Sequence, residues 1–476
     1  MNKLFAMTQR SSKETFDAMT KIPRYGIYGL IIALTVAGLF QYTGDLYIYL
    51  LFSVVSNALL YLGFRKNAIF FDAFIGIFFW LGFWLKLTIR VSFMDGLFQE
   101  AVGEFNGTGS AFDHALLVSS CGMLGLITAS IVREKIIFGY PMKTAGYKHN
   151  GILNIYKDYR NSILICFAFL FISVALTNIY FGIYQKGEIT QTILPLGLNG
   201  IYKWLLLFGL ASVSAVILQC ELIIKMQLSY RVIILSLLES FSTNVSLLSR
   251  GMILNSFALA YGVYASLRIN SIKLNLRVLA TSFLIFSILF VSSVYVVNYI
   301  RSSTPTSTGS IDGVNRSLFL DRWVGIEGVM AVSSNHKVGS SLWQDAWKEI
   351  YSENEMSFYD KNLIISRYEN TDFTKKHSVS LPGVLAFFFY PGSFSFLFVC
   401  MFLLGLLAAL VEISAFKLGG NNLILCSLVA EVVAYRFVSF GYVPAQSYLL
   451  FGTIFLNLFI IYFLDRFLGV WRKLPQ

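Results

Sequence analysis

The chain has 476 residues, of which 56% are hydrophobic and 13% are charged, and its mean hydropathy is +0.66. This composition excludes an ordinary soluble globule and is typical of a protein that crosses a membrane several times. The formal net charge of +11 is explained by an excess of Lys and Arg on one side of that membrane, so it does not indicate nucleic-acid binding.

Apolar runs long enough to cross a bilayer recur along the whole chain. A spanning helix needs roughly 20 such residues. The sequence therefore predicts one all-α transmembrane domain over residues 1–476 with twelve spans. They cover residues 25–43, 46–64, 68–89, 114–132, 162–184, 201–223, 232–249, 252–267, 278–299, 383–411, 422–440 and 447–465.

The distribution of Lys and Arg predicts the orientation, because cytoplasmic loops carry the excess of these residues. The largest basic cluster runs from Arg133 to Arg160, and it lies inside when the N-terminus is cytoplasmic. Both ends are then cytoplasmic. A polar leader precedes the first apolar run, so we expect no cleavable signal peptide. The five cysteines fall within predicted spans without paired spacing, which predicts neither disulfides nor a metal site.

One outer loop is much longer than the others and covers residues 300–382, between the ninth and tenth spans. A loop of that length in a compact domain favours a functional role. Its segments "RWVGIEGVMAV" and "LWQDAWKEIY" predict short helices that lie on the outer membrane surface.

The seventh span carries a polar stripe that ends in an arginine. Ser236, Glu239, Thr243, Ser246 and Arg250 recur at steps of three and four, so they share one helix face. That face should point into the bundle, either as hydrogen-bonding contacts between helices or as the wall of a wet cavity. We expect Gly251 to permit a tight break before the next span.

Other cations fall near the outer ends of spans. Arg436 has Glu431 five residues earlier, so an ion pair between them is an alternative to a binding role. Lys86 and Arg90 share one face, and their alternative is to extend to the membrane interface. Together these cations predict an outer site for a lipid phosphate or pyrophosphate, since guanidinium groups bind two oxygens at once.

The long loop supplies further candidates. His377 and Glu327 are residue types that accept a proton from an attacking hydroxyl. Glu327 has two alternative roles, which are to balance Arg322 or to cap a helix. Trp323 is either an interfacial anchor or a platform for a sugar ring.

Residues 230–445 resemble the bacterial oligosaccharide repeat-unit polymerases of the O-antigen type, including the enterobacterial common antigen polymerase. The segments that carry the resemblance are "SRGMILN", "DRWVGIEGVMAV", "HSVSLPGVLAFFFYPGSFSFLFVCMFLLGLL" and "AYRFVSFGY". The resemblance implies a GT-C-like glycosyltransferase of the bacterial inner membrane. It would join undecaprenyl-diphosphate-linked repeat units in the periplasm, for an O-antigen, a capsule or a related polysaccharide. Its implied partners are this lipid-linked donor and acceptor, membrane lipids and a chain-length regulator protein.

Carried onto this sequence, the resemblance gives Arg250 and Arg436 a place at the membrane edge, Arg322 and Glu327 a place in the loop, and His377 the loop exit. We expect Glu327 or His377 to accept the proton, and the arginines to stabilise the departing diphosphate without a metal or another cofactor. Lys86 and Arg90 join the diphosphate site, and Trp323 binds sugar. The chain lacks a clear pair of the arginine-to-glycine loop motifs of some polymerases, which leaves the roles within the loop open.

Three alternatives remain open at this point. An O-antigen ligase uses a similar fold and donor but transfers the glycan to lipid A core. A polysaccharide flippase also commonly has twelve spans, although flippases connect them with short turns. A non-catalytic assembly scaffold would tolerate loss of Arg250 and Arg436.

Overall fold

The computed structural model describes residues 26–65, 67–98, 100–136, 147–249, 251–270, 272, 276–303, 323–364 and 379–471. Every regular element in these ranges is a helix. Eight helices or continuous helical runs are long and apolar enough to cross a membrane, which is consistent with the predicted polytopic membrane protein. They are α2 (Leu46–Gly63), α3 through α4 (Phe70–Phe93), α5 (Gly109–Ile136), α6 (Asn150–Phe181), η2 through α8 (Pro195–Lys225), α11 (Leu276–Ser303), α17 (Phe394–Leu418) and η4 through α19 (Pro444–Trp471).

The other four predicted spans are also helical, but they are not among those eight. They correspond to Gly26–Gln41, α9 (Tyr230–Ser246), α10 (Met252–Ile269) and α18 (Leu423–Val438). The number of twelve spans therefore stays a prediction.

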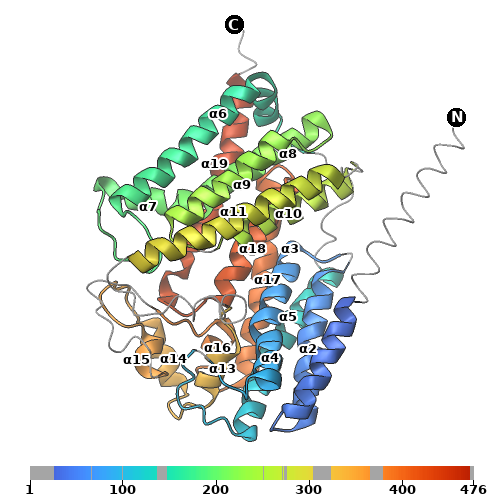
Figure 1. Cartoon of the computed structure of the whole chain (residues 1–476), viewed down its shortest axis with the longest axis vertical. Coiled ribbons are helices and arrows are strands. Elements are labelled where there is room, and N and C mark those ends of the chain that lie inside the picture. Colours follow the sequence, from blue (N-terminus) through green and yellow to red (C-terminus); the bar gives the residue numbers. More distant parts are fainter. Residues whose placement is uncertain are drawn as a thin grey trace, which may run out of the picture.

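The helices form two groups that cross at an incline (Figure 1). In this view α2 to α5 stand nearly upright, and α6 to α11 run diagonally above them. Helix α18 joins the groups, because it packs against α3 on one side and α10 on the other. Its side chains are almost all buried, as expected of a helix that lies between two layers.

The predicted tenth span is interrupted near its start. Helix α16 (Val384–Phe388) ends before Pro391 and Gly392, and α17 begins at Phe394. Pro391 has no N–H to donate, and Gly392 adopts a left-handed φ of +75°. The Ser393 hydroxyl then accepts a hydrogen bond from the N–H of Phe396, which caps α17.

The long loop contributes short helices at one end of the bundle, lower left in Figure 1. These are α13 (Ile326–Ser333), α14 (Ser340–Trp347), α15 (Phe358–Asn362) and α16. We call this the loop end. Helices α13 and α14 overlap the two segments that predicted short helices.

Helix α13 does not lie on the surface, so that part of the prediction was wrong. Its residues from Ile326 to Val332 are buried, and the helix packs against α5 and α16. Gly325 and Gly328 permit this insertion, since a Cβ on either would collide with the backbone of Gly82 or Pro382. Helix α14 is amphipathic, with Leu342 and Ala346 buried.

A π-helical segment between α3 and α4 faces α13. It covers Trp80–Leu85, and its indoles are fixed to α2: Trp80 donates to Asn57 and Trp84 to Ser53. Such segments arise where a helix gains one residue, and they often mark functional positions. Gly82 in this segment contacts the backbone of Val324.

Candidate functional site

The polar stripe of α9 faces the interior of the bundle, as predicted. Ser236, Glu239, Thr243 and Ser246 are all buried. Thr243 donates a hydrogen bond to Glu239, and Ser246 accepts one from the side-chain amide of Asn178 on α6. These contacts agree with the first of the two interpretations of the stripe, in which its polar side chains form hydrogen bonds inside the helix bundle.

The chain breaks between α9 and α10, but Gly251 is not the cause. The left-handed residue is Leu248, whose φ is +49°, whereas Gly251 has a φ of −79° that any residue can adopt. Two polar bonds hold the break, one from Ser249 N–H to the carbonyl of Asn244 and one from Gly251 N–H to the Ser249 hydroxyl. Arg250 itself lies outside the described residues.

This break lies against the connection between α6 and α7 (Leu198–Trp204). The Lys186 N–H donates to the carbonyl of Leu247 over 2.9 Å. Asn178 donates to the carbonyls of both Tyr184 and Ser246. The C-terminal end of α9, at Ser246 and Leu247, is therefore adjacent to Tyr184 and Lys186.

Two further cations lie in the neighbourhood of the same connection. The Lys203 ammonium on α7 lies 5.1 Å from the centre of the Tyr184 ring. Arg436 on α18 is close enough to interact electrostatically with Tyr184 and to repel Lys203. The Glu353 carboxylate, which belongs to the long loop, attracts the Lys203 ammonium. Among the described residues, no carboxylate forms an ion pair with Arg436.

Sequence reasoning missed Lys186 and Lys203. The signal for Lys203 was available, because it interrupts the apolar run 201–223 near its predicted outer end, as Lys86 does in its own span. Lys186 follows a span and carries no such signal. Its position beside Leu247 depends on contacts between segments that are distant in the chain.

The expected alternative pairing of Arg436 with Glu431 is absent from the described structure. Residues five positions apart on an α-helix point in different directions, since each residue turns the helix by roughly 100°. Glu431 is buried, and its carboxylate is attracted by the Lys186 ammonium. Arg436 is half-buried on the part of α18 that approaches Tyr184.

Lys86 does not extend to the membrane interface, so that interpretation was wrong. It is 1% exposed, and its Nζ lies 2.7 Å from Glu327 Oε1 on α13. The same Nζ donates to the carbonyl of Trp323 over 2.7 Å. Burial raises the pKa of the Glu327 carboxyl, an effect that the Lys86 ammonium opposes.

Arg90 is also buried, and its guanidinium donates to the carbonyl of Leu97 over 3.0 Å. Trp323 is half-buried and stacks on Phe78, with ring centres 5.7 Å apart. Phe78 in turn meets the edge of Tyr435, the residue before Arg436. An aromatic contact path therefore leads from the Lys86–Glu327 pair to the neighbourhood of Arg436.

A segment of the long loop forms hydrogen bonds both to the residues between α6 and α7 and to the turn after α18. We call residues 349–353 the strap. Glu349 accepts hydrogen bonds from the N–H groups of Phe358 and Val443. Glu353 accepts bonds from the N–H and the hydroxyl of Thr190. The strap thereby places Glu353 near Lys203.

The charges at the opposite end of the bundle are paired differently. Arg133 lies 2.6 Å from Asp72, Arg160 lies 2.8 Å from Glu221, and Arg65 lies 3.1 Å from Glu134. Each of these cations has a carboxylate partner within the protein. Arg436 differs from them in having none among the described residues.

Two more predicted site residues, Arg322 and His377, lie outside the described residues, as does Arg250. His377 precedes a segment that is held at the loop end, where Ser380 N–H donates to Asp360 and Gly383 N–H donates to the carbonyl of Phe440. Within the described ranges, no group of three or more His, Cys, Asp or Glu side chains is arranged to hold a metal ion.

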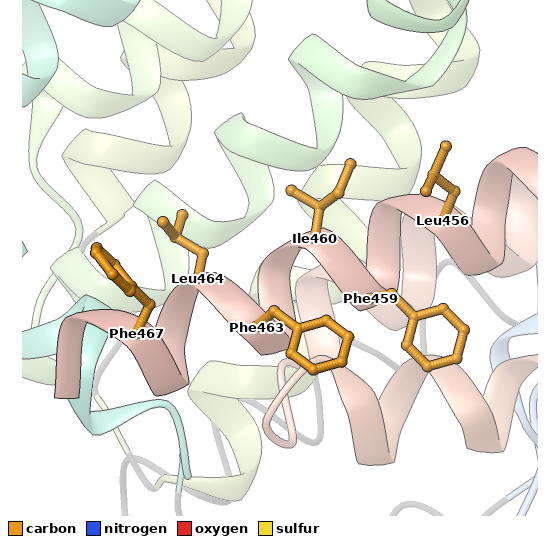
Figure 2. Close-up of a pocket in the computed structure, with 6 residues that line it drawn as sticks. All are labelled: Leu456, Phe459, Ile460, Phe463, Leu464 and Phe467. Carbon is orange, nitrogen blue, oxygen red and sulfur yellow. The ribbon is translucent and has the colours of Figure 1, made fainter. Parts of the chain in front are cut away.

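A shallow apolar hollow of about 700 Å³ lies along α19, away from these charges. Figure 2 shows the six aliphatic and aromatic side chains of α19 that line it. All six are exposed, as expected of a helix in contact with lipid chains. The hollow offers no group for chemistry, so the candidate site stays at the loop end.

Comparisons with protein families, with curated proteins and with solved structures find no match for this chain.

Proposed function

We propose that the chain is a membrane glycosyltransferase that polymerises polyprenyl-diphosphate-linked oligosaccharide repeat units at the loop end. The observation that carries this proposal is the approach of Lys203 and Arg436, two cations that repel each other beside Tyr184. Juxtaposed cations favour an external anion, and among the described residues no carboxylate forms an ion pair with Arg436. A lipid diphosphate suits a site at the ends of apolar helices.

The adjacent chain break adds to this argument. Leu247 is bonded to Lys186, and Arg250 follows three residues later. In the proposal Arg250, Lys203 and Arg436 bind the diphosphate, and Arg322 from the loop completes the site. The family resemblance of the sequence supports the choice of an undecaprenyl carrier.

The proposed reaction is a direct displacement at the anomeric carbon. An acceptor hydroxyl forms a new C–O bond, and the bond between the sugar and the donor diphosphate breaks. The cations stabilise the negative charge that develops on the leaving diphosphate. His377 accepts the proton of the hydroxyl, because Glu327 is buried and already bound to Lys86.

The pair of Lys86 and Glu327 then has a positioning role. The Lys86 ammonium donates to the carbonyl of Trp323, which fixes this part of the long loop against the helix bundle. Trp323, stacked on Phe78, presents its remaining surface to the sugar. We further propose that the fold has twelve spans in a GT-C-like arrangement. It would lie in the bacterial inner membrane, with cytoplasmic termini and a periplasmic loop end.

The test uses the purified full-length protein in lipid nanodiscs with undecaprenyl-diphosphate-linked repeat units. The expected product is a ladder of chain lengths on a gel. A single transfer to lipid A core would indicate a ligase, and movement of the substrate across the bilayer without a new bond would indicate a flippase. Absence of any ladder with a matched substrate would overturn the proposal.

A further inference from the structure

A tyrosine in the strap and a tyrosine after α18 form an aromatic pair near the cations. Tyr351 in the strap and Tyr442 after α18 have ring centres 5.9 Å apart, with the ring planes inclined at 52°. We call them the tyrosine pair. Tyr351 is 43% exposed and Tyr442 is half-buried, so part of each ring is accessible from outside the protein.

Both rings are held by their hydroxyl groups. The Tyr351 hydroxyl donates to Glu353 Oε1 over 2.9 Å, and the Tyr442 hydroxyl donates to the carbonyl of Ser352 over 3.1 Å. Glu353 is itself fixed by Thr190. Rings anchored in this way offer contact area at a low cost in conformational entropy.

The tyrosine pair adjoins the cation site. Tyr351 donates to Glu353, which is bound to Thr190 in the connection between α6 and α7. The same connection carries Tyr184, whose ring lies under the Lys203 ammonium. The strap oxygens of Ser352 and Glu353 border the two rings. The structure therefore places flat apolar faces with a polar rim next to a candidate diphosphate site.

We infer that the tyrosine pair is a saccharide-binding subsite in which a sugar ring packs on Tyr351 or Tyr442. A pyranose has an apolar C–H face and a rim of hydroxyls, which matches an aromatic face bordered by oxygen acceptors. This inference rests on the proposed function, since it assigns a place to the sugar that adjoins the diphosphate. It is distinct from the role of Trp323, which lies beside Phe78.

The test measures sugar binding without any transfer reaction. Full-length protein in nanodiscs is titrated with the methyl glycosides of glucose, galactose and N-acetylglucosamine, and saturation-transfer NMR reports contact. We expect at least one glycoside to bind with an affinity on the order of millimolar. Tyr351→Ala and Tyr442→Ala should each weaken it about tenfold, whereas Tyr351→Phe should retain most of it.

Tyr47 provides the matched control, because it is 83% exposed at the start of α2 and belongs to neither the strap nor the tyrosine pair. Tyr47→Ala should bind as the wild type does, and each variant is checked for a monodisperse elution profile. The inference is overturned if the wild type binds none of the glycosides, or if both alanine variants of the tyrosine pair bind them unchanged. If the protein binds sugar through Tyr351 but yields no ladder, the saccharide subsite is supported and the polymerase proposal is overturned.

Discussion

Lys86 on α4 and Glu327 on α13 form a buried ion pair, with Nζ and Oε1 2.7 Å apart. The pair joins the end of a span to a helix of the long loop. The same ammonium also donates to the carbonyl of Trp323, so two groups of the long loop depend on it. A buried pair of this kind responds sharply when one partner is removed, because the other charge remains buried alone.

Lys86→Met and Glu327→Gln should therefore each lower the free energy of unfolding by about 3–5 kcal/mol. The double variant Lys86→Met with Glu327→Leu should lose less than either single variant, since no uncompensated charge remains. Denaturant unfolding in detergent micelles, followed by tryptophan fluorescence, measures all three. If Glu327→Gln keeps wild-type stability but loses polymer formation, Glu327 takes part in the chemistry and is not a positioning residue.

The sequence predicted local features of the fold well and distant pairings poorly. All twelve predicted spans contain helix because long apolar runs are a local signal. The stripe on α9 was also predictable from its spacing. By contrast, the pairing of Lys86 with Glu327 and the approach of Lys203 to Arg436 join segments far apart in the chain. Spacing along one helix carries no information on such contacts.

The close approach of α13 to the π-helical segment gives a second prediction. An alanine Cβ at position 82 would lie 2.6 Å from the carbonyl oxygen of Val324, and one at position 325 would collide with Gly82. Gly325→Ala should push α13 out of the bundle and break the Lys86–Glu327 pair. We expect a loss of unfolding free energy of about 3 kcal/mol or more.

Gly452 on α19 is the matched control, since nothing lies within 4 Å of an added Cβ there. Gly452→Ala should be neutral or stabilising by up to about 1 kcal/mol, because alanine favours a helix. The two variants are compared by thermal unfolding in the same detergent. Equal stability of Gly325→Ala and the wild type would contradict the tight packing of α13.

The strap gives a third prediction, which concerns local opening. Glu349 accepts two backbone N–H groups, from Phe358 and Val443, and Glu349→Ala leaves both without this acceptor. Loss of two such bonds should raise the population of the open strap, so chymotrypsin should cleave after Tyr351 about tenfold faster or more. Glu355→Ala removes only an exposed ion pair with Lys361 and should leave the rate unchanged. Equal rates for the two variants would show that Glu349 does not hold the strap.

The last prediction addresses the cations. Arg436→Ala should reduce polymer formation about a hundredfold to a thousandfold, the usual effect of removing one group that stabilises developing negative charge. Arg436→Lys should recover only part of this activity, because an ammonium does not bind two oxygens in one plane. Lys203→Ala should cost less, about tenfold, since Lys203 is more exposed than Arg436 and its charge is screened by solvent. Arg268→Ala, at the far end of α10, changes an exposed arginine remote from the site and should have no effect. A ladder of normal length and amount from Arg436→Ala would remove this residue from the diphosphate site.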